Sequence, residues 1–305
     1  MIARLAAFLI ALAPMAAAGQ ALNLGAGGSG QPIEITARQG IEWDRDASRY
    51  IANGDAAARQ GDTTVRADRL IAWYRSAATG GTEIFRYEAQ GNVRIATATQ
   101  TAFGDRGVFD VDSETMVLTG RALRLVAQND TITARDSLEY HGRREVAVAR
   151  GGAMVVSGDR RMTADVMTAY FGPPAPAPRP QAQARGNQRQ PQRAQAPATP
   201  ANAPENQRLK RVESFGNVHV STPTEIARGD RGVYNMETGI AQLAGNVRLT
   251  RGDNQLAGDF AEVNNNTGVS RLLSRPAEGG DGRVRGLFVP QQAQQQPARP
   301  GTASR

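Results

Sequence analysis

The side chains of this 305-residue chain with the clearest capacity for chemistry are six aspartates that recur at regular intervals. Paired carboxylates can transfer protons or bind calcium. Each aspartate, however, lies 14 or 16 residues after a glycine that opens a short alternating segment. An aspartate in such a place can cap backbone N–H groups where a strand turns, so we interpret these residues as structural corners. The pairs are Gly54 and Asp68, Gly91 and Asp105, Gly120 and Asp136, Gly151 and Asp165, Gly216 and Asp230, and Gly245 and Asp259.

The rest of the sequence lacks the patterns that catalysis or metal binding needs. His141 and His219 are the only histidines, and neither has a partner at the spacing of a metal site or a catalytic triad. The chain has no cysteine, which excludes thiolate ligands and nucleophiles. No phosphate-binding loop or dinucleotide fingerprint occurs in a strand-to-helix setting. We therefore predict no catalytic residue, no metal site and no cofactor, and a protein that is not an enzyme.

The segments around the periodic glycines have the alternation of β-strands. Val93 and Ile95 alternate with polar neighbours, and the unit that begins at Gly245 repeats the pattern. This is the period of half-buried strands. Gly-Asp pairs such as Gly61-Asp62 then supply a tight turn. Because no stretch after the first eighteen residues has a helical period, the sequence predicts an all-β fold of many short antiparallel strands.

One long step between two periodic glycines holds a segment of different composition. Successive glycines are mostly 29 to 37 residues apart, but 65 residues separate Gly151 from Gly216. The Pro/Gln/Ala-rich segment 172–207 lies inside this step, and without its 36 residues the step is 29. We predict a disordered insert within one continuous repeat array. The predicted parts are β-structure at 33–171, the insert at 172–207, β-structure at 208–290 and a disordered tail at 291–305.

The first eighteen residues are typical of a secretory signal peptide. Arg4 precedes an apolar stretch, and three alanines end at Ala18 before Gly19. The apolar stretch is shorter than the ~20 residues of a membrane-spanning helix. We predict a signal peptide at 1–18 that is cleaved between Ala18 and Gly19, and an exported protein. The alternative is an N-terminal anchor that is retained.

The sequence pI near 10.4 suggests a nucleic-acid-binding protein, but the positions of the charges argue against one. Segments 1–18, 172–207 and 291–305 together carry six of the seven net positive charges. The segments predicted to fold are therefore close to neutral, whereas a nucleic-acid-binding domain carries its basic residues on the fold itself. We predict no nucleic-acid partner.

The repeated motifs resemble the OstA-type repeat of the LptA family of lipopolysaccharide transport proteins. The shared pattern is a Gly-Asn-Val strand, a Gly-Asp turn, an Ala-Asp or Gly-Asp corner, and an aromatic residue that precedes a Thr-Gly pair. Here the last motif is Phe109-Asp110 followed by Leu118-Thr119-Gly120, and 282–290 resembles the final strand of the family. The resemblance covers 33–171 and 208–290, and the insert between them departs from the usual pattern.

The resemblance implies a twisted β-jellyroll, open along one side, whose interior holds lipid acyl chains. It implies a periplasmic carrier that binds lipopolysaccharide and stacks head to tail into a homo-oligomeric bridge between two membranes. The implied partners are an LptC-like inner-membrane component and an LptD-like outer-membrane component. An apolar groove makes physical sense, because each exposed CH₂ of an acyl chain costs about 0.8 kcal/mol in water.

The candidate lipid-binding residues are the inward apolar residues of the repeated strands, which alternation places on one face. The alternative for each of them is ordinary core packing. A rival function for the whole chain is a β-repeat scaffold or adhesin of the envelope that binds no lipid. The candidate groove residues are Val93, Ile95, Val155, Val218, Val220, Val247 and Leu249.

Overall fold

The computed structural model describes residues 33–78, 80–172, 208–274 and 283–289, which are almost entirely antiparallel β-strand. The exception among these residues is one 3-10 turn, η1 (Gly142–Arg144). The predicted signal peptide 1–18 with its cleavage site at Ala18 and Gly19, insert residues 173–207 and the tail 291–305 lie outside the described residues. The all-β fold is confirmed. The strands are β1 (Glu34–Thr36), β2 (Ile41–Asp44), β3 (Arg49–Gln60), β4 (Thr63–Ser76), β5 (Thr82–Ala96), β6 (Gln100–Asp110), β7 (Thr115–Thr119), β8 (Leu123–Ala127), β9 (Asp130–Ala134), β10 (Ser137–His141), β11 (Val146–Ser157), β12 (Arg160–Gly172), β13 (Arg208–Ser221), β14 (Glu225–Asn235), β15 (Ile240–Arg251), β16 (Asn254–Asn264), β17 (Val269–Leu273) and β18 (Arg285–Leu287).

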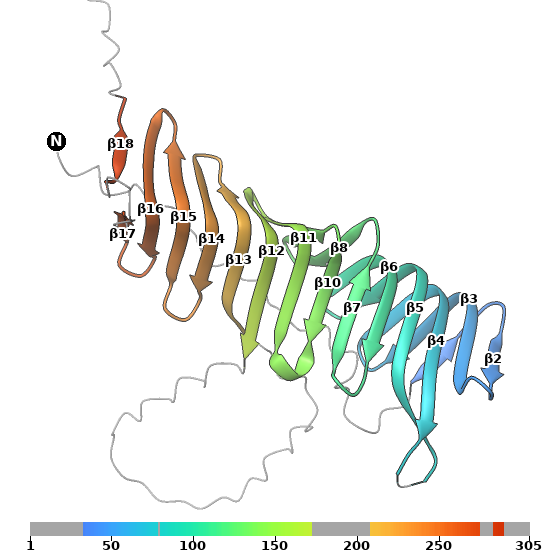
Figure 1. Cartoon of the computed structure of the whole chain (residues 1–305). Helices are drawn as coiled ribbons and strands as arrows, with labels where there is room; N and C mark the ends of the chain where they lie inside the picture. The colour runs from blue at the N-terminus through green and yellow to red at the C-terminus, as the bar shows by residue number, and fades with distance from the viewer. Residues whose placement is uncertain (1–32, 79, 173–207, 275–282, 290–305) are drawn as a thin grey trace, which may run out of the picture.

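The strands form one antiparallel ladder that is bent along its length into two facing layers. The long strands β3 to β6 and β11 to β16 bend at mid-length and contribute one half to each layer. Layer A also contains β2, β7, β10 and β17, and layer B also contains β1, β8, β9 and β18. Figure 1 shows the strands following one another along a single axis, from β2 at one end to β17 and β18 at the other. The fold is a twisted, open β-jellyroll.

Alternate long strands bend where two consecutive residues take positive φ. In β5 these residues are Gly91 (φ 73°) and Asn92 (φ 46°), and the register with β6 shifts between Gln90 and Val93. Glycine has no Cβ to clash in this conformation, and asparagine tolerates it better than most residues. The Gly-Asn pair therefore turns the strand from layer A into layer B. The same conformations recur at Gly54 and Asp55, Gly151 and Gly152, Gly216 and Asn217, and Gly245 and Asn246.

The neighbouring long strands carry the periodic aspartates at the same corner. Asp68 of β4 lies so close to Gly91 that a Cβ on the glycine would sit 2.1 Å from Oδ2 of the aspartate. The side-chain amide of Asn92 donates a 2.9 Å hydrogen bond to this oxygen. Close approach and positive φ therefore both require glycine here. The same contact joins Asp105 to Gly120, Asp136 to Gly151, Asp165 to Gly216, and Asp230 to Gly245.

The corner aspartates make contacts beyond the backbone capping that the sequence predicts. Asp105 accepts a backbone hydrogen bond from Arg121 N at 2.9 Å, as expected, but Asp68, Asp165 and Asp230 accept one from an asparagine side chain. Five of the six periodic aspartates, all except Asp259, also contact the corner glycine of the following repeat. The contact forms because the Cβ position of each of these glycines faces the preceding strand, which carries the aspartate. Each repeat is therefore locked to the next one.

The strands on either side of 173–207 are neighbours in the ladder. β12 and β13 pair along their length, and Gly172 lies opposite Arg208 at the end of the pairing. The ladder therefore continues from the first group of repeats to the second without a break. No helix in the described ranges is long and apolar enough to cross a membrane.

We predict that alanine at a corner glycine destabilises the fold more than alanine at a turn glycine. Gly252 (φ 54°) has no heavy atom within 4 Å of a built Cβ, so Gly252→Ala should lose about 1–2 kcal/mol through backbone strain alone. Gly91→Ala adds the clash with Asp68 and should lose about 1–3 kcal/mol more. Urea unfolding of the two variants measures the difference. Equal losses would show that the corner contact does not constrain the fold.

We also predict that 173–207 can be replaced by a two-residue Asn-Gly turn without loss of stability. Gly172 and Arg208 are already paired, and shortening the connection between them lowers the entropic cost of closing it. The thermal unfolding midpoint should equal or exceed that of the parent chain. A lower midpoint or two separate transitions would mean that the two groups of repeats are not one cooperative array.

Candidate functional site: an apolar interior between the layers

A large cavity lies between the two layers at the N-terminal end of the ladder. Cavity 1 encloses about 860 Å³, part of it open to solvent. Layer A contributes Tyr50, Tyr87 and Phe109, while layer B contributes Val65 and Ile95. The rings of Tyr87 and Phe109 stack with their centroids 6.4 Å apart. Burial in this apolar space raises the pKa of Tyr87. The lining suits a flexible apolar ligand, because it presents few hydrogen-bonding groups.

A second cavity of similar size lies between the layers in the C-terminal repeats. Cavity 2 encloses about 890 Å³, again partly open, and extends from β12 to β16. Layer A contributes Tyr234, Met236 and Ala241, while layer B contributes Met162 and Val220. Methionine side chains adapt readily to irregular apolar ligands. Both cavities therefore offer the same kind of surface.

Large and small apolar side chains share the inner face of layer A. One cross-strand row passes through every strand of layer A from β3 to β17, and alanines interrupt its aromatic residues. The row consists of Tyr50, Ala72, Tyr87, Phe109, Met116, Tyr140, Ala147, Ala169, Val212, Tyr234, Ala241, Val263 and Ser270.

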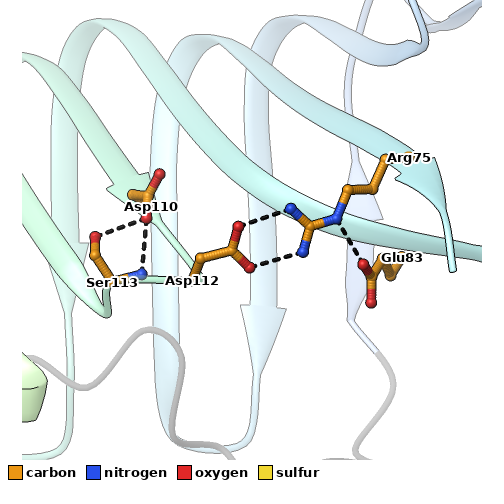
Figure 2. Close-up of polar contacts among 5 residues, drawn as sticks. All are labelled: Arg75, Glu83, Asp110, Asp112 and Ser113. Atoms are coloured by element: carbon orange, nitrogen blue, oxygen red, sulfur yellow. Dashed lines mark hydrogen bonds and ion pairs between the residues drawn. The ribbon is translucent and has the colours of Figure 1, made fainter. Parts of the chain in front are cut away.

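An ion-pair clamp fastens the rim of layer A beside cavity 1 (Figure 2). Arg75 of β4 donates two hydrogen bonds to Asp112, at 2.7 and 2.8 Å, and its Nε donates a third to Glu83 at 2.6 Å. These bonds hold the pKa of Asp112 below its usual range and the pKa of Arg75 above its own. Asp110 accepts hydrogen bonds from the backbone N and the Oγ of Ser113, and the bond from the hydroxyl lowers its pKa most. The clamp thus joins the β4–β5 hairpin to the β6–β7 turn.

The outer face of layer A carries half-exposed arginines over buried glutamates. Glu88 is 6% exposed and accepts hydrogen bonds of 2.7 Å from Nε of Arg106 and from Nε2 of Gln90. The bond from Arg106 is the main reason why the pKa of Glu88 lies below its usual range, although burial acts in the opposite direction. The same outward row also contains the buried apolar residues Ile51 and Ile71, so the outer face is mixed in character.

All seven residues predicted for the groove lie on the inner face of layer B. Ile95 lines cavity 1, and Val218 and Val220 line cavity 2. The other four face the same interior but pack in the apolar cores beside the cavities. These four are Val93, Val155, Val247 and Leu249.

Sequence reasoning missed the contribution of layer A to the cavities. Phe109 and Tyr234 line cavity 1 and cavity 2, and each lies four residues after a periodic aspartate. This recurring aromatic was the available signal. Alternation alone does not reveal its role, because it does not show that the half-strand after the aspartate faces the half-strand before it.

The described residues include no group of three or more histidine, aspartate and glutamate side chains that could hold a metal ion. His141 approaches Glu139 at 3.3 Å on the outer face of layer A, and His219 lies on the outer face of layer B. Burial lowers the pKa of His219 most, and the positive charges of Arg228 and then Arg161 lower it further. Neither histidine reaches the interior.

The fold and its interior define a protein of the open β-jellyroll class with an apolar space between its layers. The model of one family, the LptA/(LptD N-terminal domain) LPS transport proteins, matches residues 34–146 and 131–269. Because these matches together cover most of the chain, the chain belongs to this family. The role that the family description gives its members is transport.

Two other proteins are similar to this chain. An uncharacterised protein of Rhizobium meliloti (strain 1021) is 31% identical over 132 residues, which are 41% of this chain and 69% of the relative. The crystal structure of LptH from Pseudomonas aeruginosa, the LptA-homologous periplasmic component of its lipopolysaccharide transport device, superimposes with a TM-score of 0.37. It is 15% identical and covers 53% of this chain and 96% of its own length. This superposition adds nothing to the family assignment.

We predict that removing the Glu88 carboxylate flattens the acid dependence of stability. Because its folded pKa is lowered, the ion pair stabilises the fold fully above the unfolded pKa of about 4.3 and is lost as pH falls through the folded pKa. The free energy of unfolding of the parent should therefore fall between about pH 5 and pH 3 more steeply than that of Glu88→Gln. Arg106→Gln should flatten the same region. Urea unfolding across this pH range measures it, and parallel profiles for parent and Glu88→Gln would contradict the assignment.

Proposed function

We propose that the chain is a periplasmic carrier that holds the acyl chains of lipopolysaccharide between its two layers while the lipid travels from the inner to the outer membrane. The apolar interior is the observation that supports this proposal most strongly. An acyl chain gains about 0.8 kcal/mol for each CH₂ removed from water. Because the cavity linings are mainly aliphatic and aromatic, they supply this gain without unpaired polar groups.

The ends of the ladder support a bridging role. At the N-terminal end, the edge strand β2 exposes Ile41 (55%) and Trp43 (51%), and at the C-terminal end Leu273 (50%) and Leu287 (58%) are exposed on β17 and β18. Edge strands with unpaired backbone groups add strands from a partner, and exposed apolar residues favour this. Such addition would extend the interior into a second copy of the chain, an LptC-like component or an LptD-like component.

Photo-crosslinking from paired positions tests lipid binding. A photoreactive amino acid at Ile95 or Val220 lies in a cavity, while its strand neighbours Arg94 and His219 lie on the outer face. In cells that export lipopolysaccharide, the two inner positions should give lipopolysaccharide adducts and the two outer positions should give none. Equal labelling from both faces, or no adduct from either inner position, would contradict the proposed function.

A further inference from the structure

The apolar interior is not one uniform groove, because a packed waist separates the two cavities. Cavity 1 is lined by strands β1 to β7 and cavity 2 by strands β12 to β16. In layer B, five strand-to-strand steps lead from Ile95 at cavity 1 to Met162 at cavity 2. At a strand spacing of ~4.8 Å, the two linings are roughly 24 Å apart there. The interior between them is filled by side chains that line neither cavity.

The waist is filled by large apolar side chains in close contact. Leu118 is 0% exposed and Leu123 is 2% exposed. Leu138 packs against both apolar cores, so it lies where the two cores meet. Near the rim of layer A, the rings of Tyr140 and Phe171 meet edge to face with their centroids 6.5 Å apart. An acyl chain can cross this region only if these side chains move.

Buried polar side chains make the layer B rim between the two cavities unsuitable for an acyl chain. Gln100 is 7% exposed and Asp130 is 5% exposed, and both lie at the layer B rim, beside the β5–β6 and β8–β9 turns, in the cross-strand row that continues to Arg160. The Nε2 of Gln100 has no hydrogen-bond partner. Covering these groups with hydrocarbon would leave them without compensation for lost water. Both the packing of the waist and the polarity of this rim therefore oppose a continuous lipid.

Each cavity has basic residues at its layer B rim. Arg59 lines the rim of cavity 1, beside the β3–β4 turn. Arg160 and Arg161 line the rim of cavity 2, beside the β11–β12 turn. Guanidinium groups favour phosphate and carboxylate partners. By strand alternation Arg160 lies on the inner face, whereas Arg59 and Arg161 adjoin the inward residues Ala58 and Met162 and lie on the outer side of the rim. Each cavity therefore has an apolar interior for a tail and guanidinium groups at its rim for an anionic head that projects out of the cavity.

We propose that the chain contains two separate sites for anionic amphiphiles, one in cavity 1 and one in cavity 2, divided by the waist. Each site takes an apolar tail between the layers and an anionic head group at the layer B rim. This inference rests on the proposed function but goes beyond it, because it sets the number of ligands and divides the path. Transfer along the chain then requires a step in which a ligand leaves one site and enters the other.

Native mass spectrometry of the full chain with dodecyl phosphate tests the two sites. The parent should bind two equivalents. Ala58→Trp fills cavity 1 and Val220→Trp fills cavity 2, and both positions are half-buried in one cross-strand row of layer B. Each variant should bind one equivalent, and the double variant should bind none.

Val155→Trp is the matched control, because Val155 is half-buried in the same row but lies at the waist. It should retain two equivalents. If the parent binds only one equivalent, and either cavity variant abolishes that binding, the interior is a single continuous site and the inference is overturned. Loss of an equivalent in Val155→Trp would overturn it too. No binding to the parent would instead overturn the proposed function.

Single cysteines provide a second measurement if a tryptophan variant fails to fold. The chain has no native cysteine, so Ala58→Cys and Val220→Cys each introduce one thiol. Dodecyl phosphate should slow alkylation at both positions and should leave Val155→Cys unaffected. Equal protection at Val155→Cys would contradict a waist that excludes ligand.

The rim arginines are tested by charge removal. Arg59→Gln should weaken binding of dodecyl phosphate in the Val220→Trp background by roughly twofold to fivefold, because solvent-exposed ion pairs contribute modestly. The same change in the Ala58→Trp background should leave the remaining affinity unaltered. Equal weakening in both backgrounds, or none in either, would contradict a head-group site at the rim of cavity 1.

Discussion

The rest of the structure depends on the contact between an aspartate and the corner glycine of the next repeat. The contact leaves no room for a Cβ, and the positive φ of the glycine bends its strand from one layer into the other. Because the aspartate belongs to the preceding strand, every corner fixes the position of the following one. Stability therefore arises between neighbours, as in other repeat proteins. At the N-terminal end, Gln39 takes the place of the aspartate against Gly54, and at the C-terminal end Asp259 accepts a 2.9 Å hydrogen bond from Ser274.

Much of this architecture could be predicted from the sequence, because the features that build it are local. The Gly-Asp turns at Gly61, Gly158 and Gly252 join neighbouring long strands, as their spacing indicates. The alternation in Val93 and Ile95 correctly identifies the inner face of layer B. These signals persist in a single sequence because turn conformation and strand alternation depend on a few adjacent residues.

The parts that could not be predicted depend on contacts between distant residues. The regular spacing in the sequence relates Gly91 to Asp105, whereas in the folded chain Gly91 contacts Asp68 of the preceding strand. The role of Phe109 and Tyr234 in the cavities depends on how the two halves of each bent strand face each other. The waist depends on the packing of Leu118, Leu123 and Leu138 across the layers, which no periodicity distinguishes from the lining of a cavity.

The fold combines ion pairs on the outer face of layer A with an apolar interior between the layers. Ion pairs such as the one between Glu88 and Arg106 lie on the outer face of layer A, and apolar side chains of both layers line the space between them. The central claim is that this space holds lipid. Mass spectrometry of the lipids that co-purify with the protein from the periplasm of its own host tests this claim most directly. The account predicts lipopolysaccharide or its lipid precursor in the purified protein, and its loss when cavities 1 and 2 are both filled. Protein that carries no lipid, or that carries the same lipid after both cavities are filled, would contradict it.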